Sequence, residues 1–171
     1  MKTRTVVLCA LFTACALVVN MAEGLFPLPL PGVKLGAANV FTLAALVLLG
    51  VKEAFAVALL RVLLAWLLGG NWFAFVCSLS GSLCAAALMS LIWSRYRKDF
   101  SLPWISVAGA WAFNLGQVAA VSWLLGDLRA FYYCLPLFAA GTATGWAVGL
   151  LAAQVCRRLD RTELSQQQPR P

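Results

Sequence analysis

Six apolar segments follow one another along this chain, separated by short links. They cover approximately residues 6–22, 36–50, 53–68, 73–93, 103–125 and 131–155. A helix needs about 20 apolar residues to cross the hydrocarbon core of a bilayer. Inside lipid, a segment must satisfy its own backbone polar groups, which helices do and open sheets do not. The sequence therefore predicts an all-α membrane bundle of six transmembrane helices.

The composition supports a membrane protein over a soluble one. The chain is 63% hydrophobic and only 11% charged, whereas soluble domains carry about 25% charged residues. A net charge of +7 could suggest a nucleic-acid partner. The basic residues instead fall in short loops and at the termini, where they set membrane topology. We expect the lipid bilayer as a partner and no nucleic acid.

The basic residues predict which side of the membrane each loop faces. If both ends are cytoplasmic, Lys34 and Arg129 lie outside and Arg61 lies within the membrane. The inner side then carries the ten others: Lys2, Arg4, Lys52, Arg95, Arg97, Lys98, Arg157, Arg158, Arg161 and Arg170. Basic residues favour the cytoplasmic side, so this orientation is expected. Residues 1–156 form the predicted membrane domain, and 157–171 form a polar cytoplasmic tail, disordered from Thr162 onward.

Several kinds of chemistry are disfavoured by residue type. The chain has no histidine, which removes histidine acid–base chemistry and histidine metal ligands. The six cysteines form no C-x-x-C pair. Buried apolar cysteines are expected instead of a disulfide framework or a zinc site. We therefore expect no catalytic residue, no metal site and no cofactor.

Arg61 lies inside the apolar stretch 54–68. An ionisable side chain at membrane depth is costly and usually faces the bundle interior or a polar cavity. It could pair for packing with Glu53, Asn114, Gln117 or backbone carbonyls, or it could bind an anionic ligand. Glu53 lies two helical turns away, too far for an ideal pair. The absence of another acidic residue within a predicted segment favours the ligand.

The link between the first two segments carries Pro27, Pro29 and Pro31. Prolines at alternate positions exclude a regular helix, so this apolar link is either a lid over a pocket or an interfacial connector. Lys34 and Asn39 follow at the start of the second segment. The positive end of a helix dipole there suits an anion. Alternatively, Lys34 simply reaches the lipid headgroups.

Polar and aromatic residues in the later segments have two interpretations each. Asn114 and Gln117 are three residues apart and share a helix face that should point into the bundle. They either orient a polar ligand or join helices by hydrogen bonds. Trp66, Trp111 and Trp146 lie deep in their segments, where they fill the core or line an aromatic pocket.

Small residues predict close helix contacts. They occur at 78–82 and at 141–149, where Gly141, Gly145 and Gly149 recur. Such surfaces let helices approach closely and are more typical of packing than of a binding site. Ala10 and Ala14 form a similar pair on the first helix, which could dock another helix of this chain or a separate subunit.

Four stretches carry a family resemblance. They are Pro31-Gly-Val-Lys34-Leu-Gly36-Ala-Ala-Asn39-Val-Phe-Thr-Leu, Gly50-Val-Lys-Glu-Ala54, Leu60-Arg61-Val-Leu-Leu and Phe113-Asn-Leu-Gly-Gln117. In this order they resemble the bacterial Gx transporter family, also described as heptaprenyl diphosphate synthase component I, over roughly residues 5–155. The family is similar to the substrate-binding S components of energy-coupling factor (ECF) vitamin transporters.

The resemblance implies a multi-pass protein of the bacterial cytoplasmic membrane, with an outward-facing pocket gated by the first extracellular link. It also implies that helix one docks a transmembrane coupling subunit, for which Ala10 and Ala14 are the matching positions. The chain has no G-x-x-x-x-G-K-[ST] motif, so any ATPase must be supplied in trans.

The two family descriptions imply different functions. Prenyl-chain synthesis needs paired aspartates that hold magnesium against a diphosphate. Asp99, Asp127 and Asp160 are isolated from one another, and no D-D-x-x-D motif is present. We therefore expect no enzyme. A non-catalytic membrane accessory of heptaprenyl diphosphate or quinone metabolism is the alternative to a transporter subunit.

The leading hypothesis is a substrate-binding transporter subunit that captures a small anionic or amphipathic ligand. Lys34 and Arg61 would attract its negative group, and Asn39, Asn114 and Gln117 would orient its polar atoms. A third hypothesis is a structural assembly protein in which Arg61 and the amides form one packing network.

Overall fold

The computed structural model describes residues 3–24, 34 and 36–167, with side chains as far as Leu159. These residues form six α-helices and one short 3-10 helix, without a strand among them. The elements are α1 (Thr3–Glu23), α2 (Asn39–Leu48), α3 (Val51–Leu67), α4 (Trp72–Tyr96), α5 (Leu102–Leu125), η1 (Leu128–Tyr133) and α6 (Cys134–Gln167). The all-α fold class predicted from the sequence is confirmed.

Local sequence signals explain where several helices begin and end. Asn71 caps α4, because its Oδ1 accepts a hydrogen bond from the Ala74 N–H at 2.6 Å. Pro103 lies in the first turn of α5, where its missing N–H costs nothing. Gly126 ends α5 in the left-handed conformation, with φ 64°. Gly50, with φ 124°, makes the tight turn between α2 and α3.

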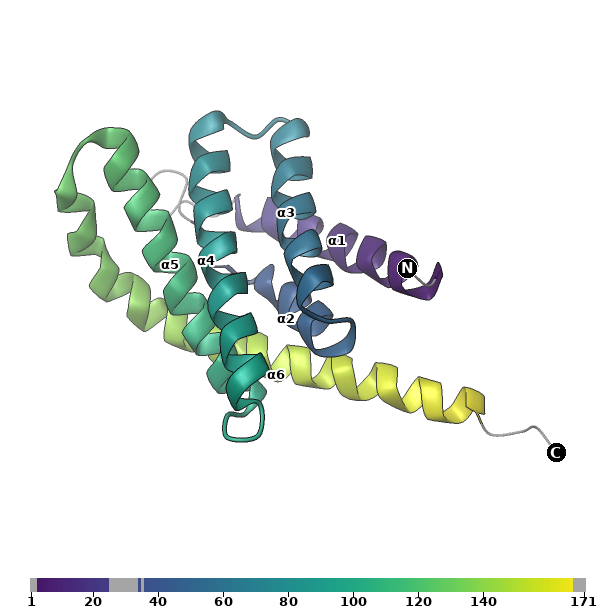
Figure 1. Cartoon of the computed structure of the whole chain (residues 1–171). Helices are drawn as coiled ribbons and strands as arrows, with labels where there is room; N and C mark the ends of the chain where they lie inside the picture. Colours follow the sequence, from purple (N-terminus) through teal and green to yellow (C-terminus); the bar gives the residue numbers. More distant parts are fainter. Residues whose placement is uncertain (1–2, 25–33, 35, 168–171) are drawn as a thin grey trace.

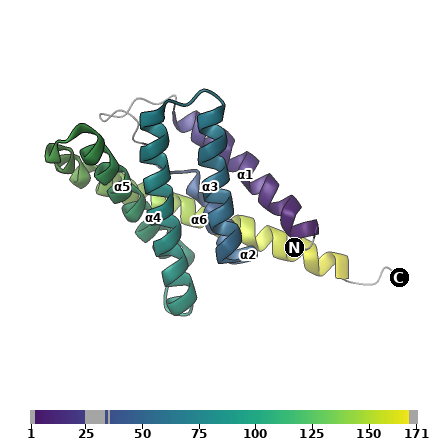
Figure 2. The same ribbon diagram turned by 45° about the horizontal axis from the view of Figure 1, so that its top comes forward.

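The helices pack around the short helix α2. Helices α3 and α4 run side by side in opposite directions, and α5 packs beside α4 (Figure 1). Helix α6 runs back along α5 and then packs on α2. Helix α1 packs on α2 and α3 and crosses α3 at an angle (Figures 1 and 2). Helix α2 contacts each of the other five α-helices. Seven of its ten residues are buried, so α2 belongs to the core and not to the lipid-facing surface.

The small-residue surfaces bring helices into close contact, as predicted. A Cβ at Gly145 of α6 would lie 2.8 Å from the Val107 Cα of α5. On α4, a Cβ at Gly81 would lie 2.8 Å from the Gln117 Cγ and 2.8 Å from the Phe113 carbonyl oxygen. Neither position has room for a side chain. The glycines therefore set how closely α5 approaches its two neighbours.

Four helical stretches are long and apolar enough to cross a membrane. They are Thr3–Glu23, Trp72–Tyr96, Leu102–Leu125 and Leu128–Leu159. Helix α3, which carries Arg61, has 17 residues, slightly fewer than the roughly 20 that cross a hydrocarbon core. Helix α2, with ten residues, is about 15 Å long, roughly half the thickness of a hydrocarbon core. The described residues thus support a membrane protein in which the second helix is too short to span.

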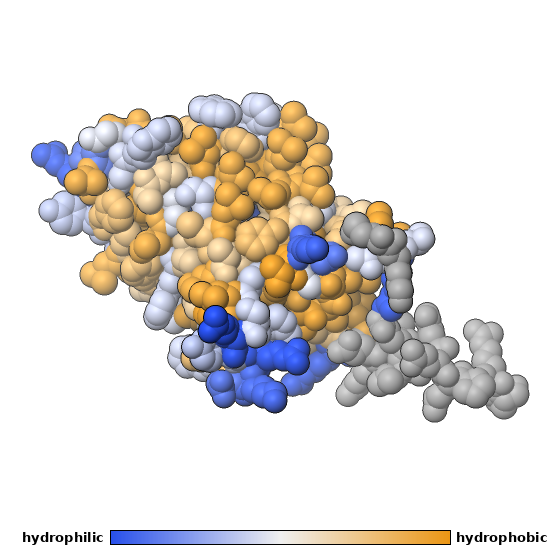
Figure 3. Space-filling view, viewed as in Figure 1, coloured by the Kyte–Doolittle hydropathy of each residue, from blue (hydrophilic) through white to orange (hydrophobic). Residues whose placement is uncertain are grey.

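The surface has the polarity that a bilayer requires. Hydrophobic residues cover the face over α3 and α4 (Figure 3). The exposed leucines of α3 are Leu59, Leu60, Leu63, Leu64 and Leu67. Hydrophilic residues gather at the lower end of the view, near the turn between α4 and α5 (Figure 3). Large exposed apolar surfaces with this distribution face lipid and not water.

Two predictions concern the ends of the described segments. The proline-rich lid falls largely on residues 25–33, which lie outside the described residues. At the other end, α6 continues to Gln167, so the prediction of disorder from Thr162 is wrong for residues 162–167. Glu163, Leu164, Gln166 and Gln167 are good helix formers, and they extend the helix beyond its apolar part.

Candidate functional site

The Arg61 side chain is buried in the middle of the helix bundle, with 1% of its surface exposed. Its Nη2 donates hydrogen bonds to the Asn39 Oδ1 at 2.7 Å and to the Ser82 Oγ at 2.9 Å. Both acceptors are neutral. The Arg61 Nε is also buried and has no hydrogen-bond partner among the described residues. The guanidinium therefore keeps an unused donor in a place that water reaches poorly.

Asn39 is the first residue of the half-length helix α2. Because its Oδ1 accepts from Arg61, its Nδ2 points away from the guanidinium, and this buried nitrogen has no partner in the described structure. The N–H groups of Asn39 and Val40 are used in tight turns, donating to the Gly36 and Ala37 carbonyls at 3.0 and 3.1 Å. The positive end of the α2 dipole nevertheless lies beside Arg61, inside the bundle.

Gln117 of α5 holds the segment that precedes α2. Its Oε1 accepts from the Lys34 backbone N–H, and its Nε2 donates to the Lys34 carbonyl, each at 2.9 Å. Gln117 is fully buried. This two-way pairing satisfies the amide and the Lys34 backbone together. Gln117 consequently positions the Lys34 segment, and one of the two N–H groups on its Nε2 makes this contact.

The Lys34 ammonium reaches back to helix α1. Its Nζ donates to the Asn20 Oδ1 at 2.9 Å and to the Asn20 backbone carbonyl at 3.1 Å. Burial lowers the pKa of Lys34 below its usual value. Glu23 opposes this shift, and Arg61 adds to it. Lys34 and Arg61 are thus near enough for their charges to act on each other.

Glu23, the last residue of α1, is the carboxylate at this site. Its Oε1 accepts a hydrogen bond from the Ala37 N–H at 2.7 Å. Its Oε2 is buried without a partner among the described residues. The Glu23 charge acts on both Arg61 and Lys34. With Glu23 ionised, the three side chains carry a net charge of one positive unit, and Glu23 is the internal counter-ion.

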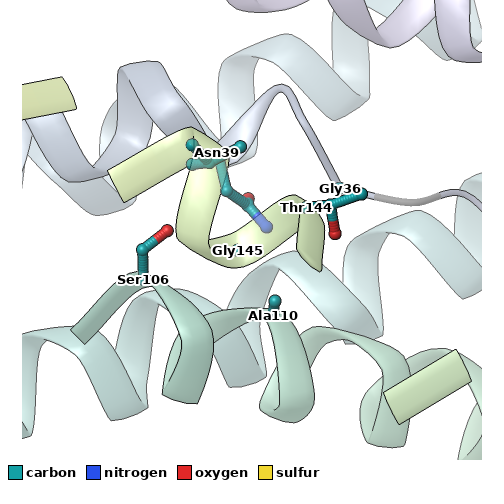
Figure 4. Close-up of a pocket in the computed structure, with 7 residues that line it drawn as sticks. Gly36, Asn39, Ser106, Ala110, Thr144 and Gly145 are labelled. Atoms are coloured by element: carbon teal, nitrogen blue, oxygen red, sulfur yellow. The ribbon is translucent and has the colours of Figure 1, made fainter. Parts of the chain in front are cut away.

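A narrow crevice lies on the other side of Asn39, between α2, α5 and α6. The space between the protein atoms here is about 170 Å³, counting the part that is open to solvent, and it has no room for a water molecule. Its lining residues are Gly36, Asn39, Ser106, Ala110, Thr144, Gly145 and Val148. The Asn39 amide nitrogen points into it, toward the α6 segment that carries Thr144 and Gly145 (Figure 4). Asn39 therefore connects the Arg61 guanidinium with this crevice.

The structure separates Asn114 from the other predicted ligand residues. The Asn114 Nδ2 donates to the Leu137 carbonyl of α6 at 2.7 Å, while Gln117 binds Lys34. Neither amide is among the hydrogen-bond partners of Arg61 in the described structure. The groups that bind Arg61 are Asn39 and Ser82, because the register of α3 turns its guanidinium toward α2 and α4.

The predicted aromatic pocket is absent from the described residues. Trp111 is 45% exposed and Trp146 is 41% exposed, while Trp66 is only partly buried. Trp66 packs against Trp72 and Phe75 beside the turn from α3 to α4. These rings therefore lie on the outer surface of the bundle, where amphipathic aromatics suit a membrane protein.

The predicted docking residues on α1 point outward. Ala10 and Ala14 are both exposed, on a helix whose opposite face is buried through Cys9, Phe12 and Ala16. The pair therefore does not pack within this bundle, which leaves it accessible to lipid or to another chain.

Sequence reasoning missed Asn20, Glu23 and Ser82 as parts of the site. Ser82 belongs to a small-residue stretch that the sequence analysis assigned to packing. Glu23 lies one residue beyond the first predicted apolar segment, 6–22, and was therefore not considered a buried residue. A usable signal was that Asn20 and Glu23 are three residues apart and share one helix face. Two polar residues on one face near the end of an apolar helix indicate a buried partner.

Comparison with known protein families identifies the chain. Residues 12–155 match the family described as heptaprenyl diphosphate synthase component I. The chain belongs to this family. The resemblance inferred from the Lys34, Arg61 and Gln117 stretches is thereby confirmed. Comparisons with curated proteins and with solved structures gave no match.

The unpaired hydrogen-bond donors around Arg61 indicate which kind of ligand the site could bind. Unpaired donors remain on Arg61, Asn39 and Asn20, whereas the unpaired acceptor nearby is the Glu23 Oε2. Together with the net positive charge, this arrangement suits an anionic oxygen group. Within the described part of the chain, no cluster of three or more Cys, Asp or Glu side chains could hold a metal ion.

Proposed function

We propose that this family member is a membrane-embedded substrate-binding subunit of a transporter and captures a small anionic or amphipathic ligand. The observation that carries the proposal is the buried Arg61 guanidinium, whose Nη2 binds two neutral oxygens and whose Nε has no partner among the described residues. A charge at membrane depth normally marks a ligand pathway or a binding site. The chain itself is proposed to be no enzyme.

The start of α2 supports the same assignment. In many membrane transporters, helices that begin inside the membrane point their positive ends at anionic groups of the substrate. Helix α2 is about half a bilayer long, and its first residue, Asn39, binds Arg61. The ligand's negative group would therefore meet Arg61, the Asn39 amide and the Lys34 ammonium. Asn20 and Gln117 would hold the Lys34 segment in place.

The proposed orientation places both ends of the chain in the cytoplasm. The basic residues of the turn between α4 and α5 then face inward, and the Lys34 segment faces the exterior. In this arrangement the chain has six membrane-embedded helices, with α2 embedded but not spanning. Ala10 and Ala14 offer an outward surface on α1 to a coupling subunit. ATPases would be supplied by other chains.

A second candidate is a non-catalytic accessory of prenyl diphosphate synthesis. It is favoured by the family description and by the affinity of clustered cations for phosphate groups. Because the tryptophans lie on the outer surface, a prenyl chain would run along the lipid-facing helices and not through an aromatic core. Adding inorganic pyrophosphate and farnesyl diphosphate separately to the purified protein distinguishes the candidates. An accessory should bind only the diphosphate that carries a prenyl chain.

Native mass spectrometry of the detergent-purified protein tests the proposed capture function. The wild-type protein should carry a bound small anion, and Arg61→Gln should lose it. Arg61→Lys, which keeps the charge, should retain part of it. Arg129→Gln, at an exposed site, is the matched control and should bind as wild type does. If wild type and Arg61→Gln carry the same species, or neither carries any, the capture function is wrong.

A further inference from the structure

A small set of charged side chains lies around the Glu23 carboxylate in the described part of the chain. Helix α1 packs on α2 and α3, and α2 has no titratable residue. Residues 24–38 contribute one charged residue, Lys34. Helix α3 contributes Arg61. Its other charged residues, Lys52 and Glu53, lie in its first turn, where the Glu53 charge acts on Cys9 near the beginning of α1. In the described structure, Lys34 binds Asn20, one helical turn before Glu23. Arg61 binds Asn39, two residues after the Ala37 that Glu23 holds. Glu23 therefore lies near both cations.

The two oxygens of Glu23 have different environments. Oε1 accepts the Ala37 N–H at 2.7 Å and so fixes the segment leading into α2. Oε2 is buried and unpaired among the described residues. A neutral glutamine could make the first contact equally well. The negative charge is therefore unnecessary for anchoring the segment, and its electrostatic effect falls on Arg61 and Lys34.

We propose that Glu23 is a specificity-determining residue that competes with the ligand anion for Arg61 and Lys34, so that anion binding is accompanied by uptake of one proton on Glu23. This inference rests on the proposed function. With Glu23 ionised, the site carries one net positive charge, and an arriving anion meets a carboxylate nearby. A proton from solvent converts that carboxylate to the neutral acid, which leaves both cations for the ligand.

Low pH favours protonated Glu23 and hence tighter anion binding. As the pH rises, the proton concentration falls, so the protonation of Glu23 that accompanies binding becomes less favourable. The affinity for the anion therefore falls. A site without Glu23 lacks this competition. It should bind the anion more tightly at high pH and with little dependence on pH.

Sulfate is a suitable probe, because its charge stays constant between about pH 4 and pH 8, a range that includes the ordinary pKa of a glutamate carboxyl group. Sulfate affinity is measured by calorimetry on detergent-purified protein across this range. Wild-type affinity should fall as the pH rises. Glu23→Gln keeps an oxygen for the Ala37 N–H, and at pH ~8 it should bind about tenfold more tightly than wild type. Glu53→Gln removes a carboxylate in the first turn of α3, about two helical turns from Arg61, and should bind sulfate as wild type does.

The outcomes separate this inference from the proposed function. If wild type binds sulfate and Arg61→Gln does not, but Glu23→Gln keeps the wild-type affinity and pH profile, the competition is disproved while the capture function stands. If sulfate binding does not depend on Arg61, the capture function fails, and the inference fails with it. A pH-independent, tighter Glu23→Gln variant supports both.

Discussion

At the scale of the residue, the hydrogen bond between Arg61 and Asn39 contributes to the stability of the fold, while the Arg61 charge is what the proposed ligand needs. The 2.7 Å bond between the Nη2 and the Asn39 Oδ1 satisfies part of a buried charge. Removing one partner of such a pair leaves the other unsatisfied, whereas replacing both with apolar residues is often close to neutral. Stability and ligand capture can therefore be separated at this pair.

We expect Asn39→Leu alone to destabilise the protein by about 2 kcal/mol, because the Arg61 guanidinium loses an acceptor. Arg61→Met alone leaves the Asn39 Oδ1 without its donor and should also be destabilising. The double variant should recover most of the loss, which thermal melting in detergent would reveal. It should still fail to bind an anion. Single variants as stable as wild type would show that this hydrogen bond contributes little.

At the scale of the element, glycines set the geometry that holds the Lys34 segment. Gly81 on α4 lets α5 approach so closely that the Gln117 Cγ would lie 2.8 Å from an added Cβ. Gln117 in turn pairs with both backbone groups of Lys34. Helix packing and the position of the Lys34 cation are therefore coupled through one side chain.

Gly81→Ala should lower the melting temperature and loosen the Lys34 segment, because the added methyl group displaces Gln117 or the Phe113 backbone. The expected cost is about 1–3 kcal/mol. Hydrogen exchange at the Lys34 amide should become faster. Leu91→Ala, on the exposed face of the same helix, is the control and should leave this amide unchanged. Unchanged exchange at Lys34 in Gly81→Ala would contradict the coupling.

The elements themselves were largely predictable, because long apolar segments in lipid have few alternatives to helices. The close contacts at Gly81 and Gly145 also followed from residue size. The length of α2 did not follow. Its apolar segment covers approximately 36–50, but Gly36 adopts φ +81° and the helix starts only at Asn39. An apolar composition does not reveal how much of a segment is helical.

At the scale of the whole molecule, the proposed orientation follows from the basic residues and can be tested with fusions. A green fluorescent protein fused after Pro171 should fluoresce, because it stays in the cytoplasm. Alkaline phosphatase should be active when fused after Gly69 or Gly126, in the proposed outer turns, and inactive after Asp99. Active phosphatase after Asp99 would reverse the orientation and put Lys34 on the cytoplasmic side.

The candidate site was less predictable than the fold because it depends on long-range register. The inward direction of Arg61 followed from the cost of a charge in lipid. Its partners could not be deduced, since Asn39 and Ser82 are 22 and 21 residues away along the chain. Glu23 was overlooked because a residue at the end of an apolar segment can lie either in water or against the bundle. The packing of α1 on α2 and α3 places Glu23 against the bundle.

We propose that the Arg61 guanidinium binds an anion through its Nε, which has no partner among the described residues. Arginine-selective ¹⁵N NMR of the detergent-purified protein observes this group, and the Arg61 signal is the one missing from Arg61→Lys. Titration with sulfate should shift the Arg61 Nε–Hε signal in a saturable way at low pH, ahead of exposed arginines such as Arg129. If the Arg61 signal stays in place while the exposed signals move, the buried cation has a structural role and the claim is wrong.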